Sequence, residues 1–145
     1  MAPKQLGSKV ILDSSVIIKW FSEEEDSDKA RVIRDSHVQG HVDIIAPDLM
    51  LYEITNALRY NNAVTEKDVQ DAVDSILELD LSIIVPTREI LHNAISIARK
   101  HNTTVYDAHY LAIAQFLNIP LITADQKFFQ KVKSTGCIAL LKEVE

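Results

Sequence analysis

The sequence predicts a three-layer α/β sandwich with a mostly parallel central sheet, and three observations lead to this fold class. Short, continuously apolar segments recur along the chain, as expected for strands buried on both faces. Segments with helical periodicity separate them. The chain has 145 residues, of which 47% are hydrophobic, close to the usual size of one domain with a substantial core. We therefore expect a single domain over residues 1–145.

The predicted strands come in chain order as K-V-I-L-D, D-I-I-A-P, L-S-I-I-V-P, I-P-L-I-T-A and C-I-A-L-L, over residues 9–13, 43–47, 81–86, 119–124 and 137–141. The helical patterns between them cover residues 26–39, 48–61, 66–79, 88–101, 106–117 and 126–133. Pro47 and Pro86 end strands, and Thr65 is a plausible N-cap for the helix that follows it. Strands that alternate with helices favour a parallel sheet with helices on its faces.

The charge balance limits the kinds of partner that the protein can have. The net charge is −6, with 21 acidic against 15 basic residues, which argues against broad nucleic-acid binding through a basic surface. A nucleic-acid enzyme stays possible, because clustered carboxylates can hold divalent cations that offset their charge. A nucleotide-binding P-loop is excluded, since the sequence contains no G-x-x-x-x-G-K.

The chain has the features of a cytoplasmic protein. It has no run of about 18 apolar residues that predicts a membrane span, and its first ten residues lack the apolar region of a signal peptide. The single cysteine, Cys137, excludes an internal disulfide and a cysteine-based zinc cage. We expect Cys137 to be a small buried residue of the last strand.

Two aspartates follow predicted strands. Asp13 ends the first strand and Asp125 follows the fourth. In open α/β sheets, ligands bind beyond the carboxyl ends of the strands, so both side chains point toward that edge. Either residue is equally well explained as the N-cap of the helix that follows it.

Glu53 lies at the border of the apolar stripe of its helix, which consists of Met50, Ile54, Ala57 and Leu58. A glutamate at such a border is usually a solvated flank. Asn56, three residues later, lies on the same side of the helix and is placed either to hydrogen-bond Glu53 or to be an unrelated surface amide.

Asp107 shares a helix face with Leu111 and Ala114. An unpaired charge on an apolar face is costly, and the first turn of a helix compensates for it only in part. A capping role therefore stays open for Asp107 as well as a metal-binding one. Four acids in an apolar neighbourhood raise one another's pKa values unless a cation joins them. Oxygen ligands without nearby His or Cys favour Mg²⁺ or Mn²⁺ over zinc.

Four sequence blocks together are similar to a known family. They are V-I-L-D-S-S-V-I-I-K-W-F, Y-E-I-T-N-A-L, V-Y-D-A-H-Y-L-A-I-A and L-I-T-A-D-Q-K-F-F. In this order and spacing the chain resembles a PIN-domain ribonuclease, and is most similar to the VapC toxins of toxin–antitoxin pairs. The resemblance runs from about residue 9 to residue 141.

The resemblance implies a PIN-like fold and a metal-dependent endoribonuclease. Its acidic metal site would consist of Asp13, Glu53, Asp107 and Asp125, with Ser15, Asn56 and Thr123 in supporting roles. The family uses Mg²⁺ or Mn²⁺ to cleave RNA, and its usual chemistry leaves a 3′-hydroxyl and a 5′-phosphate. VapC proteins usually form homodimers, and a VapB antitoxin inhibits them by covering the active-site groove. Family members often carry further acids after the fourth Asp, where this chain has Gln126, Lys127 and Gln130.

Other charged and aromatic residues are candidates for RNA contacts. Arg59 and Lys127 are the better ones, because each lies near a predicted site residue in the sequence; the others, most of them ordinary surface charges, are Lys19, Arg99, Lys100 and Lys131. His109 falls about 200° round the helix from Asp107 and is expected to be a surface or packing residue. Trp20 and Phe21 are expected to make core or partner-helix contacts. The acidic run at 22–28 is expected to be the solvated start of a helix.

Rival classes of protein fit less well. A haloacid-dehalogenase-type phosphatase needs an acid two residues after Asp13, where this chain has Ser15. A phosphoryl-accepting receiver domain needs paired acids after the first strand and a lysine after the last, and Lys142 comes too late. The alternative that stays open is a catalytically inactive PIN-like module that binds RNA or a partner protein.

Overall fold

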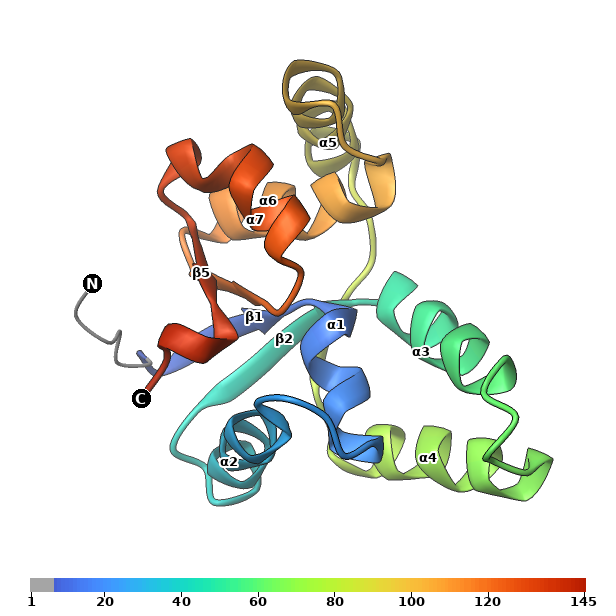
Figure 1. Cartoon of the computed structure of the whole chain (residues 1–145). Coiled ribbons are helices and arrows are strands. Elements are labelled where there is room, and N and C mark those ends of the chain that lie inside the picture. Colours follow the sequence, from blue (N-terminus) through green and yellow to red (C-terminus); the bar gives the residue numbers. More distant parts are fainter. Residues whose placement is uncertain (1–6) are drawn as a thin grey trace.

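The computed structural model describes residues 7–145 and shows a five-stranded, all-parallel sheet with helices on both faces (Figure 1). The strands are β1 (Lys9–Leu12), β2 (Asp43–Pro47), β3 (Ser82–Ile84), β4 (Leu121–Thr123) and β5 (Ile138–Leu140). Their spatial order is β3-β2-β1-β4-β5. The predicted fold class is therefore confirmed, and every predicted strand is present.

The centre of the sheet is β1, which pairs with β2 on one side and with β4 on the other. Val10, Ile11 and Leu12 of this strand are completely buried, as its continuous apolar sequence predicts. The central position matters for function, because Asp13 follows β1 directly and lies between the ends of its two neighbours. Cys137 differs from its prediction, because it precedes β5 and is only partly buried.

All six predicted helices are present. They are α2 (Ser27–Val38), α3 (Leu49–Arg59), α4 (Glu66–Glu78), α5 (Arg88–His101), α6 (Val105–Leu117) and α7 (Gln126–Val132). Thr65 caps α4 as expected and forms a capping box with Asp68. On α3, the predicted stripe residues Met50, Ile54 and Leu58 are buried, whereas Ala57 is exposed.

The short helical segment after β1 is not among the predicted helical ranges, although the capping alternative for Asp13 implied a helix there. Residues 14–21 form α1 (Ser14–Ile17) and the 3₁₀ helix η1 (Ile18–Phe21). Eight residues rich in β-branched and aromatic side chains are too few to show a helical period. Two further 3₁₀ turns, η2 (Lys133–Thr135) and η3 (Leu141–Glu143), flank β5. None of the helices within residues 7–145 has the length and apolar character needed to cross a lipid bilayer.

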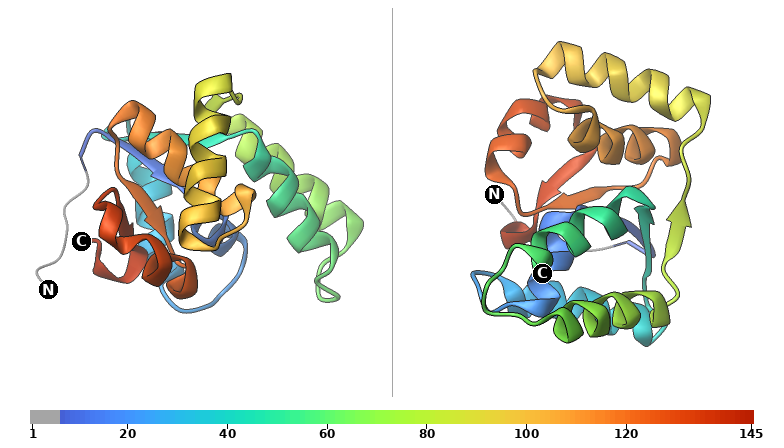
Figure 2. Two further views of the ribbon diagram at one scale, coloured as in Figure 1. Left: turned by 90° about the horizontal axis from the view of Figure 1, so that it is seen from above. Right: turned by 90° about the vertical axis from the view of Figure 1, so that its right-hand side faces the viewer.

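The helix α6 lies between the sheet and α5, as Figure 2 shows. Every residue from Ala108 to Ala114 is buried, because the helix contacts the sheet on one side and α5 on the other. Only the two ends of α6 reach the surface, and Asp107 lies in its first turn. The fold therefore brings the start of α6 to the edge at which β1 and β4 end.

Candidate active site

Asp13 is the centre of the site. Its side chain is only 5% exposed, and it occupies the N-cap position of α1 without making a side-chain cap hydrogen bond. Instead its carboxylate accepts hydrogen bonds from the hydroxyls of Thr123 at 2.7 Å, Ser15 at 3.1 Å and Ser14 at 3.3 Å. Burial raises the pKa of Asp13, the hydroxyl donors partly oppose this, and the charge of Asp125 adds to it.

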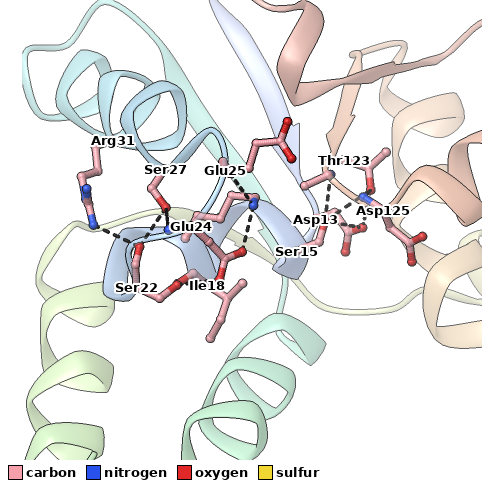
Figure 3. Close-up of polar contacts among 12 residues, drawn as sticks. Asp13, Ser15, Ile18, Ser22, Glu24, Glu25, Ser27, Arg31, Thr123 and Asp125 are labelled. Carbon is pink, nitrogen blue, oxygen red and sulfur yellow. Dashed lines mark hydrogen bonds and ion pairs between the residues drawn. The ribbon is translucent and has the colours of Figure 1, made fainter. Parts of the chain in front are cut away.

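Ser15 and Thr123 connect the end of β1 to the end of β4 (Figure 3). Their hydroxyl oxygens lie 3.3 Å apart. The Ser15 hydroxyl also accepts a hydrogen bond from the backbone N–H of Ala124, and the Thr123 hydroxyl accepts one from the backbone N–H of Asp125. The two residues therefore hold Asp13 and the Asp125 segment in a fixed relation to each other.

Asp125 is the N-cap of α7. Its carboxylate accepts a hydrogen bond at 3.0 Å from the backbone N–H of Phe128, so the cap interpretation is correct for this residue. The same carboxylate lies near enough to Asp13 and Asp107 that its charge raises the pKa of both. Asp125 therefore has a structural role and also belongs to the acidic cluster.

Asp107 occupies the first turn of α6, where Thr104 is the N-cap and accepts a hydrogen bond from the Asp107 backbone N–H. Burial raises the pKa of Asp107 to about 6, with further contributions from the charges of Asp13 and Asp125. The pKa rises even though the residue lies at a helix N-terminus, which by itself favours an anion. The ionised form of Asp107 is therefore unfavourable in the folded protein, as its position on an apolar helix face predicts.

Glu53 projects from α3 and is partly buried rather than a solvated flank. Its carboxylate accepts a hydrogen bond from the Tyr110 hydroxyl, with 2.6 Å between the two oxygens. Burial raises the pKa of Glu53, the bond from Tyr110 lowers it, and the charges of Asp13 and Asp107 raise it again. Asn56, for which both a hydrogen bond to Glu53 and an unrelated surface position were open, lies exposed one turn away.

The sequence analysis missed Tyr110 as part of this site. The residue comes three positions after Asp107, so both lie on the same side of α6, and its ring is completely buried. Burial and the charge of Glu53 raise the pKa of Tyr110, which keeps its hydroxyl protonated. The sequence feature that could have indicated Tyr110 is its hydroxyl, because it lies on a helix whose neighbouring side chains are almost all apolar.

The four predicted acids form one electrostatic cluster. The charge of Asp125 raises the pKa of Asp13 and of Asp107. The charges of Asp13 and Asp107 raise the pKa of Glu53. Within residues 7–145, however, no three carboxylate, His or Cys side chains are as close together as ligands of one metal ion. Three of the four acids are held by partners of their own, Asp13 by hydroxyl groups, Glu53 by Tyr110 and Asp125 by the N-terminus of α7. Because all four side chains offer only oxygen atoms as ligands, the chemistry of the cluster fits Mg²⁺ or Mn²⁺.

An open groove of about 870 Å³ lies beside Glu53. It follows one face of α3 and reaches the start of α6, and it is lined by Asp48, Leu49, Leu51, Tyr52, Glu53, Thr55, Asn56, Arg59 and Tyr106. Arg59 also stacks on the ring of Tyr60, with 4.7 Å from its guanidinium carbon to the ring centre. Lys127 is exposed in the first turn of α7, two residues from Asp125.

Several other candidates have structural roles. Lys19 is not a surface charge, because it is 9% exposed and its ammonium group contacts Glu24 at 2.8 Å and the backbone carbonyl of Glu25. Trp20 is a core residue, as expected. His109 is a buried packing residue. In the acidic run the helix begins at Ser27, and Glu24 pairs inward with Lys19, which lowers the pKa of Glu24.

The fold and the site together define an α/β protein with an acidic cluster at the carboxyl edge of its parallel sheet. The model of the PIN domain family matches residues 10–134, which is most of the chain. The chain therefore belongs to the PIN domain family. A related protein, Ribonuclease VapC3 of Pyrobaculum aerophilum, is 28% identical over 127 residues, which cover 85% of this chain and 94% of that protein.

Solved structures share this fold at low sequence identity. A toxin–antitoxin complex from Klebsiella pneumoniae contains a chain with a TM-score of 0.68 and 14% identity, and the match covers 93% of this chain and 99% of that one. The Mycobacterium tuberculosis toxin VapC20, described as cleaving the sarcin–ricin loop, has a TM-score of 0.68 and 15% identity, with 88% and 95% covered. These similarities confirm the PIN-like three-layer architecture.

Proposed function

We propose that this PIN domain protein is a metal-dependent endoribonuclease and the toxin of a VapBC-type toxin–antitoxin pair. The observation that carries the proposal is the acidic cluster, centred on a buried Asp13 whose carboxylate is surrounded by hydroxyl donors at the carboxyl edge of the sheet. The relative named as a ribonuclease and the neighbour described as an RNA-cleaving toxin support the same activity.

The divalent cation would be Mg²⁺ or Mn²⁺, held by Asp13 and Asp107, with Glu53 and Asp125 as direct or water-mediated ligands. When bound, such an ion activates a water and stabilises negative charge on a phosphodiester. Ser15 and Thr123 orient Asp13 by donating to its carboxylate. A carboxylate of the cluster accepts the proton of the attacking water. We expect products with a 3′-hydroxyl and a 5′-phosphate.

The groove beside Glu53 is the proposed path of the RNA. Arg59 lines it and is placed to contact phosphate groups, and Asn56 lies in the same groove. Lys127 is exposed near Asp125 and is a second candidate for a phosphate contact. Because the protein carries a net charge of −6, local cations of this kind and the metal must compensate for repulsion between the RNA and the acidic site.

The proposed partners are a VapB-like antitoxin and a second copy of this chain. The solved toxin–antitoxin complex supports an antitoxin partner, and the family resemblance leads us to expect that its C-terminal segment covers the groove. A homodimer is supported by exposed apolar side chains in the stretch of sequence from β3 to the start of α6. They are Ile83, Val85, Leu91, Ile95, Val105 and Tyr106. A cytoplasmic location stays a prediction from the sequence.

The test is cleavage of RNA by the purified protein with Mn²⁺ and with excess EDTA. We expect cleavage with Mn²⁺, none with EDTA, and none in Asp13→Asn. Asp43→Asn is the matched control, because Asp43 is a partly buried acid at the opposite, amino end of β2, where it accepts a hydrogen bond from Ser82. Equal cleavage by Asp13→Asn and Asp43→Asn would contradict the proposal.

One observation favours the alternative of a non-catalytic module that binds RNA or a partner protein. Among the residues from 7 to 145, no three potential ligands stand close enough together for one metal ion. Calorimetric titration with Mn²⁺ separates the two functions. Binding with one or two ions per chain that disappears in Asp13→Asn supports the enzyme, whereas RNA binding without metal binding or cleavage supports the module.

A further inference from the structure

The contact between Tyr110 and Glu53 joins two helices at the site. Glu53 comes from α3 and Tyr110 from α6, and their oxygens lie 2.6 Å apart. This distance is typical of a hydroxyl that donates to an ionised carboxylate. Because the Tyr110 ring is completely buried, the surrounding core fixes the direction of the hydroxyl.

Tyr110 differs from the other three tyrosines of the chain. Tyr52, Tyr60 and Tyr106 are 75%, 70% and 63% exposed, so water can satisfy their hydroxyls. A buried tyrosine hydroxyl requires a partner within the protein. Any hydrogen-bond acceptor would satisfy the Tyr110 hydroxyl if its role were only structural. Here the acceptor is Glu53, a carboxylate of the acidic cluster.

The hydrogen bond makes the two oxygens of Glu53 unequal. Oε1 accepts the bond from Tyr110 and has less negative charge to offer to a cation, while Oε2 is the better ligand. Ca²⁺ binds six to eight oxygens and often takes both oxygens of one carboxylate, whereas Mg²⁺ requires near-octahedral geometry with fewer protein ligands. A glutamate that offers one oxygen therefore suits the smaller ion.

We propose that Tyr110 is a positioning residue that occupies Oε1 of Glu53, so that Glu53 offers mainly Oε2 to a divalent cation and the site favours Mg²⁺ or Mn²⁺ over Ca²⁺. This inference rests on the proposed metal-dependent function and adds the basis of metal choice to it. The hydroxyl of Tyr110 acts through Glu53 and does not itself contact the cation.

The test compares Tyr110→Phe, which removes only the hydroxyl, with Tyr60→Phe, which removes an exposed hydroxyl at the end of α3, the helix that carries Glu53. Free Mn²⁺ is measured by electron paramagnetic resonance, and Ca²⁺ is added as competitor. We expect Tyr110→Phe to weaken Mn²⁺ binding roughly ten-fold, as loss of a residue that orients a ligand typically does. Ca²⁺ binding should weaken less, so the preference for Mn²⁺ should fall, while Tyr60→Phe should match the wild type.

The outcomes separate this inference from the proposed function. If the wild type binds Mn²⁺ and cleaves RNA, but Tyr110→Phe weakens both ions equally or neither, the inference is wrong and the proposed function stands. Equal weakening is what a purely structural role of the hydroxyl predicts. If the wild type binds no Mn²⁺, both proposals fail.

A second measurement applies even if Tyr110→Phe does not fold. Mg²⁺ is added to the wild-type protein, in which Tyr110 is the only one of the four tyrosines with a buried ring, and the near-ultraviolet tyrosine band is recorded. A cation that draws charge from Glu53 changes the hydrogen bond from Tyr110, so this band should shift as the site fills. Calorimetrically detected Mg²⁺ binding without any shift would overturn the inference.

Discussion

Asp107 is the residue whose charge the fold accommodates least well. It lies in the first turn of α6, yet burial and the charges of Asp13 and Asp125 raise its pKa to about 6. The Tyr110 hydroxyl, one turn further along the helix, stabilises a different carboxylate. The site therefore contains a charge that is unfavourable for the metal-free protein, which is common where residues are placed for chemistry rather than for stability.

We predict that Asp107→Asn abolishes RNA cleavage and raises the thermal midpoint of the EDTA-treated protein at pH 7 by a few degrees. After allowance for solvent screening, this is on the order of the shift that 1 kcal/mol gives in a chain of this size. Scanning calorimetry measures the midpoint. Asp28→Asn is the control, because Asp28 lies in the first turn of α2 with a fully exposed side chain; it should not raise the midpoint.

The pH dependence of this effect has a definite sign. The pKa of Asp107 is about 6 in the folded protein, against 3.8 for the unperturbed group, so the folded state binds the proton more tightly. The stability that this provides is fully present below pH 3.8 and is lost as the pH rises through 6. Without metal, the difference in midpoint between Asp107→Asn and the wild type should therefore appear between about pH 4 and 6 and persist at pH 7. A difference that shrinks as the pH rises would refute the assignment.

At the scale of single elements, α7 shows how one residue serves both the fold and the site. Asp125 caps this short helix through the backbone N–H of Phe128, and its charge acts on Asp13 and Asp107. The two roles depend on different properties of the side chain, since capping needs an oxygen acceptor and metal binding needs negative charge.

Two substitutions separate these roles. Asp125→Asn keeps an amide oxygen at the N-cap and should change the free energy of unfolding only slightly, while cleavage falls strongly because the charge is lost. Asp125→Ala loses the cap as well and should cost about 1 kcal/mol. Urea unfolding measured with EDTA gives both values. Equal stability of the two variants would show that the Phe128 hydrogen bond contributes nothing.

The sequence predicted the elements better than the contacts between them. Apolar runs and helical periods located all five strands and six helices, because each pattern is local. Asp13 and Asp125 were placed at one edge from strand order alone. The contact of Tyr110 with Glu53 was not predictable, since it depends on the position of α6 relative to α3 in the folded chain. Likewise, the burial of Lys19 depends on Glu24 folding back over η1, which no periodicity shows.

For the molecule as a whole, a bound cation should contribute to stability by mass action. At a metal concentration of about 100 times Kd, binding adds about 2.7 kcal/mol. We predict that Mg²⁺ or Mn²⁺ raises the thermal midpoint of the wild type and of Asp43→Asn, but not of Asp13→Asn. Differential scanning fluorimetry across a metal titration measures this. A midpoint in Asp13→Asn that rises as in the wild type would place the ion elsewhere.

The exposed apolar side chains between β3 and α6 lead to a prediction about assembly. Leu91 and Ile95 lie one turn apart on α5 and are 39% and 48% exposed. A glutamate at either position should convert a dimer to a monomer, as analytical ultracentrifugation would show, because a buried charge without a partner is costly. Val38→Glu is the control, since Val38 is 66% exposed on α2. A dimer that survives both substitutions on α5 would exclude this surface.

The position of β1 at the centre of the sheet has a consequence during synthesis. This strand comes first in the chain, yet its neighbour β4 and the last acid, Asp125, come near the end. A nascent polypeptide that has not yet reached this point holds only three of the four carboxylates and half of the pairing of its first strand. For the ribonuclease proposed above, this order means that the acidic cluster is complete only after β4 and Asp125 have been synthesised.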